Sequence, residues 1–570
     1  MTTGFTKGKA IGLFVGLASA YYVGNRAAEF VTRELAAGTP VNEMLPKFPA
    51  ALTSALFHLS TETPSVIAGI ATTVLVLLIV FYGMSGKKNT RQGEEHGSAE
   101  WATARDIKPF TTTDRSQRLQ LTATEALSLD THKTRRNLNV CVFGVSGTGK
   151  TRGYILPNLL TLDGLSFAVT DPKGEIVRMT RPHLEAKGMQ VRTFNLIDLR
   201  HSNRFNPLLY INEDEPETGI AQLTETIMAN TTGKEVRGDG FWERAERALL
   251  TALIAYVWAT MTEESGELNL PSVVDLHKAM EGSESNPDDF TSETDLKMEA
   301  ARTIVEEWKT DPVAFGAEDE TVMKVLDFAA RQYRVYQQGP AETRLSVVIS
   351  LGVRLAPLDM HDVREILASD DIALDRVGRE PTALFLQLPD THLTFRFLAA
   401  MFWQSLFAVN VYIADHNQNG ALDVPLHCFL DEFPNIGKIP GFQVLMATIR
   451  SRGISASVIA QTYTQGKAEW REDWATIVGN CDTLLYLGGN DQETTEWLSK
   501  RLGDATVTMD EYSQTYGVTG SRTKAQRTLK RALMTPDEIG RMSNDEALLL
   551  IRGIKPFKSR KAAIKTSAAA

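Results

Sequence analysis

Residues 140–152 read VCVFGVSGTGKTR, and within them Gly144–Thr151 matches the pattern G-x4-G-K-[ST]. A β-rich run enters this stretch and an apolar helical pattern follows it. In such a setting the backbone N–H groups of the loop and the N-terminus of the helix face one anion. The sequence therefore predicts a phosphate-binding loop in an α/β domain. The loop residues are Gly144, Val145, Ser146, Gly147, Thr148, Gly149, Lys150 and Thr151.

The loop motif also predicts what its last two side chains contact. Lys150 is expected at the β- and γ-phosphates of a nucleotide, and Thr151 at Mg²⁺. A second Mg²⁺ partner should follow a neighbouring buried strand. Residues 426–432, LHCFLDE, provide it: Asp431 is the predicted metal partner, and Glu432 is the predicted base that polarises the attacking water. Together these residues predict an ATPase with ATP and Mg²⁺ as cofactors.

Three further residues fit ATP hydrolysis coupled to motion. Gln461 ends the apolar run SASVIAQ, where its amide is placed to sense the γ-phosphate or to orient the water. Arg450 and Arg452, in TIRSRG, are candidate arginine fingers toward a neighbouring subunit. Either arginine is equally well explained as a surface base, so the sequence leaves open which of them acts.

The overall composition excludes several classes of protein. The 570 residues are 43% hydrophobic and 23% charged with a net charge of −10, which excludes a mostly disordered chain and a many-span membrane protein. The negative charge also excludes a basic coat protein of nucleic acid, although a local basic channel is compatible with it. The three cysteines lie far apart and favour a reducing compartment.

Strand and helix patterns alternate from about residue 138 onward, which predicts an α/β fold with a parallel sheet. Between residues 207 and 340 the pattern becomes helical, which predicts an inserted all-α domain with a surface loop at 281–294. Residues 211–340 carry 27 acidic against 11 basic residues, a net of −16. This charge fits either a protein-binding domain or a solvated helical surface. The predicted strands are 139–143, 166–170, 190–195, 382–388, 426–430, 455–461, 483–487 and 547–552.

Two N-terminal segments are predicted to be transmembrane helices. Residues 63–86 contain 24 uncharged positions, enough to cross a hydrocarbon core of about 30 Å. Lys87, Lys88 and Arg91 follow, so the positive-inside rule places the C-terminal part in the cytoplasm. Residues 10–25 are a shorter candidate span, with a cleaved signal peptide as the alternative. With two spans, residues 27–62 form a short external loop.

Further stretches give the sequence a specific family resemblance. They are HGSAEWA (96–102), TDPKGE (170–175), RFNPL (204–208), GFWERAERALL (240–250), LDEFPNIGKIP (430–440), SRGISASVIAQT (451–462) and RALMTPDEIGRM (531–542), besides the phosphate-binding loop. Together they resemble the coupling proteins of type IV secretion and conjugation, which are membrane-anchored ATPases. The resemblance implies a RecA-like domain interrupted by an all-α domain, assembly as a homo-hexamer, and a place in the bacterial cytoplasmic (inner) membrane. It also implies DNA, a relaxase with accessory relaxosome proteins, and type IV secretion channel components as partners.

DNA contact is expected to be non-specific, because the sequence contains no recognition helix or zinc finger. Candidate contacts are a basic tail and a cluster made of Arg522, Lys524, Arg527, Lys530 and Arg531. Two other functions stay open: a docking receptor for protein effectors whose ATPase only gates delivery, and a chromosome-segregation-type DNA translocase. The expected parts are a membrane anchor (1–90), the two halves of the nucleotide-binding domain (91–206 and 341–553), the all-α insertion (207–340) and the basic tail (554–570).

Overall fold

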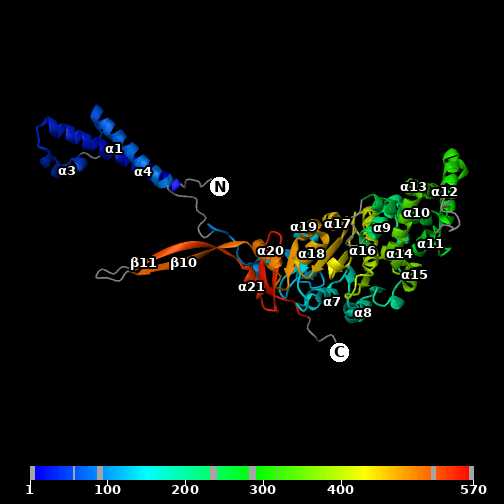
Figure 1. Ribbon diagram of the computed structural model, residues 1–570. Helices are drawn as coiled ribbons and strands as arrows, with labels where there is room; N and C mark the ends of the chain where they lie inside the picture. Colours follow the sequence, from blue (N-terminus) through cyan, green and yellow to red (C-terminus); the bar gives the residue numbers. More distant parts are fainter. Residues whose placement is uncertain are drawn as a thin grey trace. The chain divides into compact units, whose positions relative to one another are not determined.

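A computed structural model of the chain describes residues 7–54, 58–85, 94–231, 240–280, 291–316, 319–514 and 522–563 (Figure 1). The chain divides into two compact units, Met1–Glu95 and His96–Ala570. The positively charged residues 87, 88 and 91, used above for orientation, lie outside the described residues, as do 281–290 of the expected surface loop and 564–570 of the expected tail.

The N-terminal unit is built on two long helices, α1 (Lys7–Ala36) and α4 (Thr63–Ser85). The Thr72 hydroxyl on α4 donates a hydrogen bond to the Ala20 carbonyl on α1 at 2.9 Å. A Cβ atom placed on Gly24 would lie 2.1 Å from the Thr72 hydroxyl oxygen, so only glycine fits at this contact. Small residues that let two helices approach this closely are typical of helix pairs in membranes.

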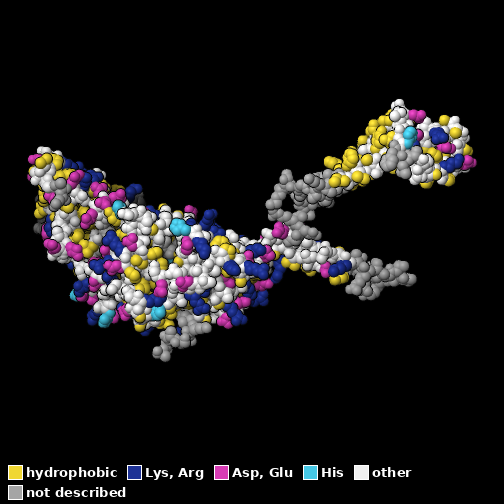
Figure 2. All heavy atoms as spheres, turned by 180° about the vertical axis from the view of Figure 1, so that it is seen from behind, with side chains coloured by type: hydrophobic (Ala, Val, Ile, Leu, Met, Phe, Trp, Pro, Cys, Tyr) yellow, Lys and Arg dark blue, Asp and Glu magenta, His cyan; other side chains and the backbone are white. Residues whose placement is uncertain are grey.

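Within the described residues, two helices are long and apolar enough to cross a membrane: Thr63–Tyr82 and α16 (Arg396–His416). Most of α16 is buried inside the second unit, as expected for a core helix. By contrast, α4 exposes large apolar side chains such as Ile70, Leu78 and Phe81, and Figure 2 shows apolar side chains gathered over this part of the unit.

The first candidate span, residues 10–25, differs from its expected form. The helix that contains it does not end near residue 25 but continues to Ala36, and it is not one of the two described helices that are apolar enough to cross a membrane. Asn25 is fully buried and exchanges two hydrogen bonds with the backbone of Ser60, at 2.9 and 3.0 Å. The expected external loop folds partly as two short helices, α2 (Val41–Met44) and α3 (Phe48–Thr53).

A nine-stranded sheet forms the centre of the second unit, in the order β13-β12-β9-β3-β8-β7-β4-β6-β5. Strands β3 to β9 pair in parallel, whereas β12 and β13 are antiparallel to their neighbours. All eight predicted strands are present, and each end agrees with the structure to within one residue. The nine strands of the sheet are β3 (Val140–Phe143), β4 (Ser166–Thr170), β5 (Gln190–Asn195), β6 (Thr382–Gln387), β7 (Leu426–Leu430), β8 (Ile454–Ala460), β9 (Thr483–Tyr486), β12 (Glu546–Ile551) and β13 (Phe557–Arg560).

Both faces of this sheet are covered, which explains why the strands are apolar almost throughout. In β3, Val140 and Val142 belong to one buried apolar cluster, while Cys141 and Phe143 belong to the other. The first cluster includes residues of α7 (Leu156–Thr161) and α8 (Glu175–Ala186). The second includes residues of α16, α17 (Phe442–Thr448), α19 (Asp473–Gly479) and α20 (Gln492–Leu502).

A helical region lies between β5 and β6, which are neighbours in the sheet. No strand occurs among the described residues of this region, and its helices gather at one end of the unit (Figure 1). It extends past the expected boundary at residue 340, because Pro340 does not end it but immediately precedes the next helix. The helices are α9 (Pro216–Thr231), α10 (Gly240–Thr260), α11 (Leu270–Lys278), α12 (Glu293–Thr310), α13 (Glu320–Gln337), α14 (Ala341–Leu355) and α15 (His361–Leu367).

Five of the strands were not predicted: β13, the two strands of a long hairpin, and the two strands of a small sheet. Part of the expected basic tail is the edge strand β13, which pairs with β12 from Phe557↔Leu549 to Arg560↔Glu546. The expected basic cluster 522–531 lies on a long antiparallel hairpin, β10 (Asp504–Gln514) and β11 (Arg522–Ala532), which projects from the sheet domain (Figure 1). A small sheet of β1 (Arg118–Gln120) and β2 (Ala126–Ser128) precedes β3. The remaining helices are α5 (Ala104–Ile107), α6 (Thr131–Thr134), α18 (Tyr463–Trp470) and α21 (Pro536–Gly540).

Candidate functional site

The phosphate-binding loop follows β3 at the carboxyl edge of the sheet. Gly147 and Gly149 have φ angles of +81° and +87°, a backbone conformation that glycine adopts without strain. The Lys150 ammonium donates to the Gly144 carbonyl at 2.9 Å, so the side chain folds back across the loop. Five residues, Thr151–Ile155, then form a π-helical turn that leads into α7. Such turns are rare and frequently lie at functional sites.

Three of the predicted side chains meet beside this loop. A Glu432 carboxylate oxygen lies 3.1 Å from the Lys150 ammonium nitrogen. The Gln461 amide nitrogen donates to both Glu432 oxygens, at 3.1 and 3.3 Å. These residues follow the parallel strands β3, β7 and β8, which lie side by side in the sheet. Glu432 has a φ of +53°, a strained conformation for a non-glycine residue and one that clusters at functional sites.

The fourth predicted residue, Asp431, immediately follows β7 and is only 5% exposed. Burial raises the pKa of Asp431 to about 7, and the neighbouring Glu432 carboxylate adds to this rise. A buried carboxylate that is costly to ionise is suited to bind a cation, because the cation would stabilise its charged form. Mg²⁺ is usually held by one or two carboxylates together with phosphates and water. Asp431 with the Thr151 hydroxyl fits this donor set.

The Asp171–Glu175 turn supports the same edge of the sheet. Asp171 is buried, and one of its carboxylate oxygens accepts a hydrogen bond from the Val177 N–H at 2.9 Å, which ties β4 to the first turn of α8. Burial raises the pKa of Asp171, and its charge is close enough to add to the rise at Asp431. Gly174 has a φ of +64°, and a Cβ there would lie 2.9 Å from the Gln387 side chain.

The two candidate arginine fingers lie at the opposite edge of the sheet. Arg450 and Arg452 precede β8, whereas Gln461 follows it, so the seven-residue strand separates them by about 20 Å. The Arg452 guanidinium forms two hydrogen bonds with the Asp415 carboxylate, at 2.7 and 2.8 Å. Arg450 donates to the Thr131 carbonyl at 2.9 Å. The structure therefore does not bring either arginine to the loop of its own subunit.

The candidate DNA contacts lie on the β10–β11 hairpin, and several are already paired. Lys524 pairs with Asp510 at 3.0 Å, and Lys530 pairs with Asp504 at 2.9 Å. Arg531 pairs with Glu538 on α21 at 2.7 Å. Arg527 instead faces Met509 across the two strands and is exposed. The Arg522 side chain lies outside the described residues.

Sequence reasoning missed a chain of buried polar groups behind the loop. The Tyr154 hydroxyl, in the π-helical turn, lies 2.6 Å from the Ser457 hydroxyl on β8. The His427 ring on β7 lies between Ser457 and Ser455, at 2.8 and 2.7 Å. Burial lowers the pKa of His427 to about 3, so the ring is neutral. The interruption of two apolar strands by histidine and serine is the signal that would have revealed this chain.

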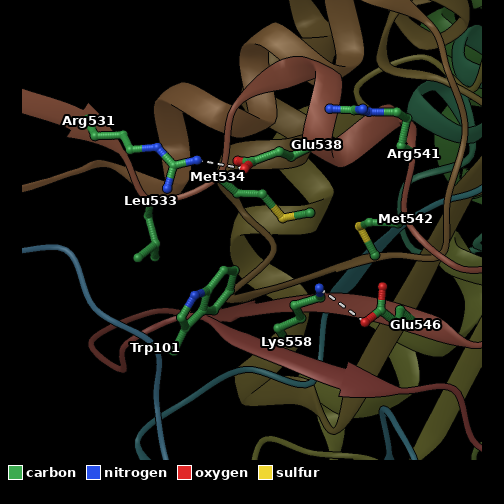
Figure 3. A pocket seen from close by; sticks show the side chains of 9 residues that line it. All are labelled: Trp101, Arg531, Leu533, Met534, Glu538, Arg541, Met542, Glu546 and Lys558. Atoms are coloured by element: carbon green, nitrogen blue, oxygen red, sulfur yellow. Dashed lines mark hydrogen bonds and ion pairs between the residues drawn. The ribbon is translucent and has the colours of Figure 1, made fainter.

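A separate cavity of about 380 Å³ lies beside the base of the hairpin (Figure 3). Trp101, Met534 and Met542 give it apolar walls, while Arg531–Glu538 and Lys558–Glu546 form ion pairs at it. None of the residues predicted to bind nucleotide or metal lines this cavity. It brings together two of the stretches that carry the family resemblance, 96–102 and 531–542.

Known proteins are similar to this chain in sequence or in fold. A TraG conjugal transfer protein of Agrobacterium fabrum is 24% identical over 430 residues, covering 74% of this chain and 59% of that protein. A TraG protein of Escherichia coli is 24% identical over 493 residues, covering 80% of this chain and 73% of that protein. The plasmid coupling protein TrwB, solved with ADP and Mg²⁺, has a TM-score of 0.54 at 14% identity and covers 82% of this chain and 93% of its own.

The chain therefore spans less than two thirds of the Agrobacterium relative's length, and its likeness to TrwB shows a shared fold. The family model described as type IV secretory system conjugative DNA transfer matches residues 100–564, which include the loop, both acidic residues after β7, Gln461 and the hairpin. This chain belongs to the type IV secretory system conjugative DNA transfer family.

Proposed function

We propose that this protein is a membrane-anchored ATPase that couples DNA–relaxase substrates to a type IV secretion or conjugation channel. The observation that carries the proposal is the convergence of Lys150, Glu432 and Gln461 beside a glycine loop, in a chain of the conjugative DNA transfer family. These side chains follow three different strands, which lie side by side in the sheet.

The residues divide the chemistry of ATP hydrolysis among themselves. The loop N–H groups and Lys150 bind the phosphates, and Thr151 and Asp431 would hold Mg²⁺, which neutralises phosphate charge when bound. Glu432 accepts the proton of the attacking water. Gln461 holds the Glu432 carboxylate by its amide and orients the base or the water. The relative TrwB has been solved with ADP and Mg²⁺, which supports both ligands for this chain.

The partners follow from the family and from the anchor. The exposed apolar helix α4 supports insertion in the bacterial inner membrane, with α1 as a second span and the ATPase unit in the cytoplasm. DNA, a relaxase with relaxosome proteins, and channel components are the proposed partners. A homo-hexamer would let Arg450 or Arg452 reach the loop of a neighbouring subunit, since neither reaches its own.

The test is ATP hydrolysis by the full-length protein in detergent, with and without single- and double-stranded DNA. We expect DNA to raise the rate at low salt, and Lys150→Ala and Glu432→Gln to abolish it. Purified protein that is oligomeric but does not hydrolyse ATP would contradict the proposal. A hydrolysis rate that does not change when DNA is added would instead favour the second candidate function, described next.

The second candidate is a docking receptor for protein effectors whose ATPase only gates delivery. The acidic charge of residues 211–340 favours it, because this region is suited to bind a basic protein surface rather than DNA. Specific capture of a relaxase or secreted protein by the full-length chain, without DNA stimulation of hydrolysis, would support the receptor. DNA-stimulated hydrolysis without any capture would favour the chromosome-segregation-type translocase.

A further inference from the structure

The C-terminal strand brings a lysine to the back of the phosphate-binding loop. The Lys561 ammonium nitrogen lies 2.8 Å from the Thr148 carbonyl oxygen and 3.2 Å from the Asn544 side-chain oxygen. More than 400 residues of sequence separate Lys561 from Thr148. A long and flexible side chain is held here by two acceptors, one of which belongs to the loop itself.

The surrounding backbone places this lysine. Lys561 immediately follows β13, and its N–H donates to the Asp545 carbonyl at 2.8 Å, which continues the pairing of β13 with β12. Side chains alternate along a strand, so Lys561 points to the same side of the sheet as the buried Phe557. Burial also lowers the pKa of Lys561, and the Asp545 carboxylate partly opposes this shift.

The segment packs directly against the turn that follows the loop. A Cβ atom on Gly153 would lie 3.4 Å from the Ala562 carbonyl oxygen and 3.8 Å from the Lys561 Cβ, which are ordinary van der Waals distances. Lys561 and Ala562 therefore lie within contact distance of the turn, next to the loop that Lys561 contacts.

The contact acts on a peptide unit that is expected to bind phosphate. The Thr148 carbonyl and the Gly149 N–H belong to one trans peptide, so they point in opposite directions. An ammonium that holds the carbonyl on the outside of the loop therefore turns the Gly149 N–H toward the inside. In loops of this motif the backbone N–H groups cradle the phosphates. A cation at the carbonyl also polarises the amide and strengthens its N–H as a donor.

We propose that Lys561 is a positioning residue for the phosphate-binding loop: it holds the Thr148–Gly149 peptide in the orientation that binds nucleotide phosphate. This inference rests on the proposed binding of nucleotide at residues 144–151. Because linkage is reciprocal, a nucleotide that binds the loop also secures the C-terminal segment against it. The segment thereby responds to whether the site is filled.

The test compares Lys561→Gln with Lys561→Arg and a matched control in the full-length protein. The control is Lys558→Gln, which removes a lysine of the preceding strand β13 whose partner is Glu546 at 3.1 Å, at the separate cavity (Figure 3). Binding of fluorescent ADP with Mg²⁺ is measured at equilibrium, and ATP hydrolysis gives KM and kcat. The thermal unfolding midpoint without nucleotide is recorded for each variant.

We expect Lys561→Gln to weaken ADP binding and raise KM by about tenfold, the scale of one charge-assisted hydrogen bond, with a smaller change in kcat. Arginine at 561 should restore most of the affinity, and Lys558→Gln should bind like the wild type. ADP should also slow tryptic cleavage at Arg560 in the wild type but not in Lys561→Gln. If Lys561→Gln unfolds earlier, recovery of binding by the arginine variant decides between positioning and folding.

Two results would overturn the inference. One is wild-type ADP affinity in Lys561→Gln, and the other is loss of affinity that arginine does not recover. Failure of the proposed function looks different: the wild type would not bind ADP, or Lys150→Ala would bind it as well as the wild type does, and both proposals would then fall together.

Discussion

The Lys150 ammonium and the Glu432 carboxylate lie 3.1 Å apart, so the lysine expected at the phosphates is paired with the expected base. Both side chains are mostly buried, at 9% and 18% exposure. Phosphate that enters the loop must therefore compete with Glu432 for Lys150. The predicted phosphate binding by Lys150 and the predicted base function of Glu432 are therefore coupled before any nucleotide binds.

This pair predicts opposite effects of Glu432→Gln on binding and on catalysis. Loss of the carboxylate removes the base and should lower kcat by about a hundredfold or more. It also frees Lys150, so ATP should bind up to about fivefold more tightly, the scale of a partly screened ion pair. Binding of ATP and single-turnover hydrolysis measure the two effects. Glu493→Gln, on the surface, serves as the control, and weaker binding by Glu432→Gln would contradict the competition.

The Arg452–Asp415 pair separates a catalytic arginine from a structural one. If Arg452 acts in a neighbouring subunit, Arg452→Ala should lower kcat by about a thousandfold, while Asp415→Asn should retain most of the activity. If the pair only stabilises the subunit, both variants should lose stability and activity together. Hydrolysis rates and unfolding midpoints of the two variants distinguish these outcomes. Arg450→Ala, examined in parallel, shows which arginine acts.

Because His427 is buried and neutral, we expect it to destabilise the folded protein in mild acid. Its pKa is about 3 in the folded protein against an ordinary value of 6.5, so the unfolded chain binds more protons below pH 6.5. The contribution of His427 to stability should therefore fall as the pH drops from 6.5 toward 3, by about 2 kcal/mol at pH 5. Asp431, whose pKa is raised to about 7 in the folded protein, contributes in the opposite direction over this range. Unfolding free energies of the wild type and of His427→Gln at pH 7 and pH 5 isolate the His427 contribution: between pH 7 and pH 5 the wild type should lose about 2 kcal/mol relative to His427→Gln, whereas His416→Gln, which removes an exposed histidine, should behave like the wild type.

Arg527 should contribute more to DNA binding than Lys530 does. Lys530 is paired with Asp504 at 2.9 Å, whereas Arg527 faces Met509 across the hairpin. Arg527→Gln should lower the dependence of log K on log salt by about 0.7–0.9, the value for one phosphate contact, and Lys530→Gln should lower it less. Anisotropy of a labelled oligonucleotide at several salt concentrations measures both slopes. If both variants keep the wild-type slope of log K against log salt, DNA contacts another part of the protein.

From the sequence we could predict the strands whose apolar residue pattern matches their burial in the structure. The strands that lead to Lys150, Asp431 and Gln461 are buried on both faces, so their sequences are mostly apolar. In the structure Glu432 meets Lys150 because the carboxyl ends of the parallel strands β3 and β7 lie at one edge of the sheet. The roles of Gln461 and of the two arginines remain predictions.

The missed elements have weak or misleading local signals. In β10, apolar Val507 and Met509 alternate with polar residues, as expected for a strand. The many charged residues of β11 obscured the same alternation in the second half of the hairpin. β13 is a short edge strand with two exposed bases, so it resembled a tail. Pro340 resembled a boundary but precedes the helix α14. The contact of Lys561 with Thr148 joins residues too far apart in sequence for any local pattern to predict.

The position of β3 between β8 and β9 has a consequence for the timing of synthesis. Val140 pairs with Ser457 and Thr483, which leave the ribosome more than 300 residues after it does. At about 5–20 residues per second, roughly 17–70 s pass before the loop strand has both neighbours. The N-terminal helices emerge well before that point. The proposed membrane anchor is thus synthesised before the proposed ATP site can be completed.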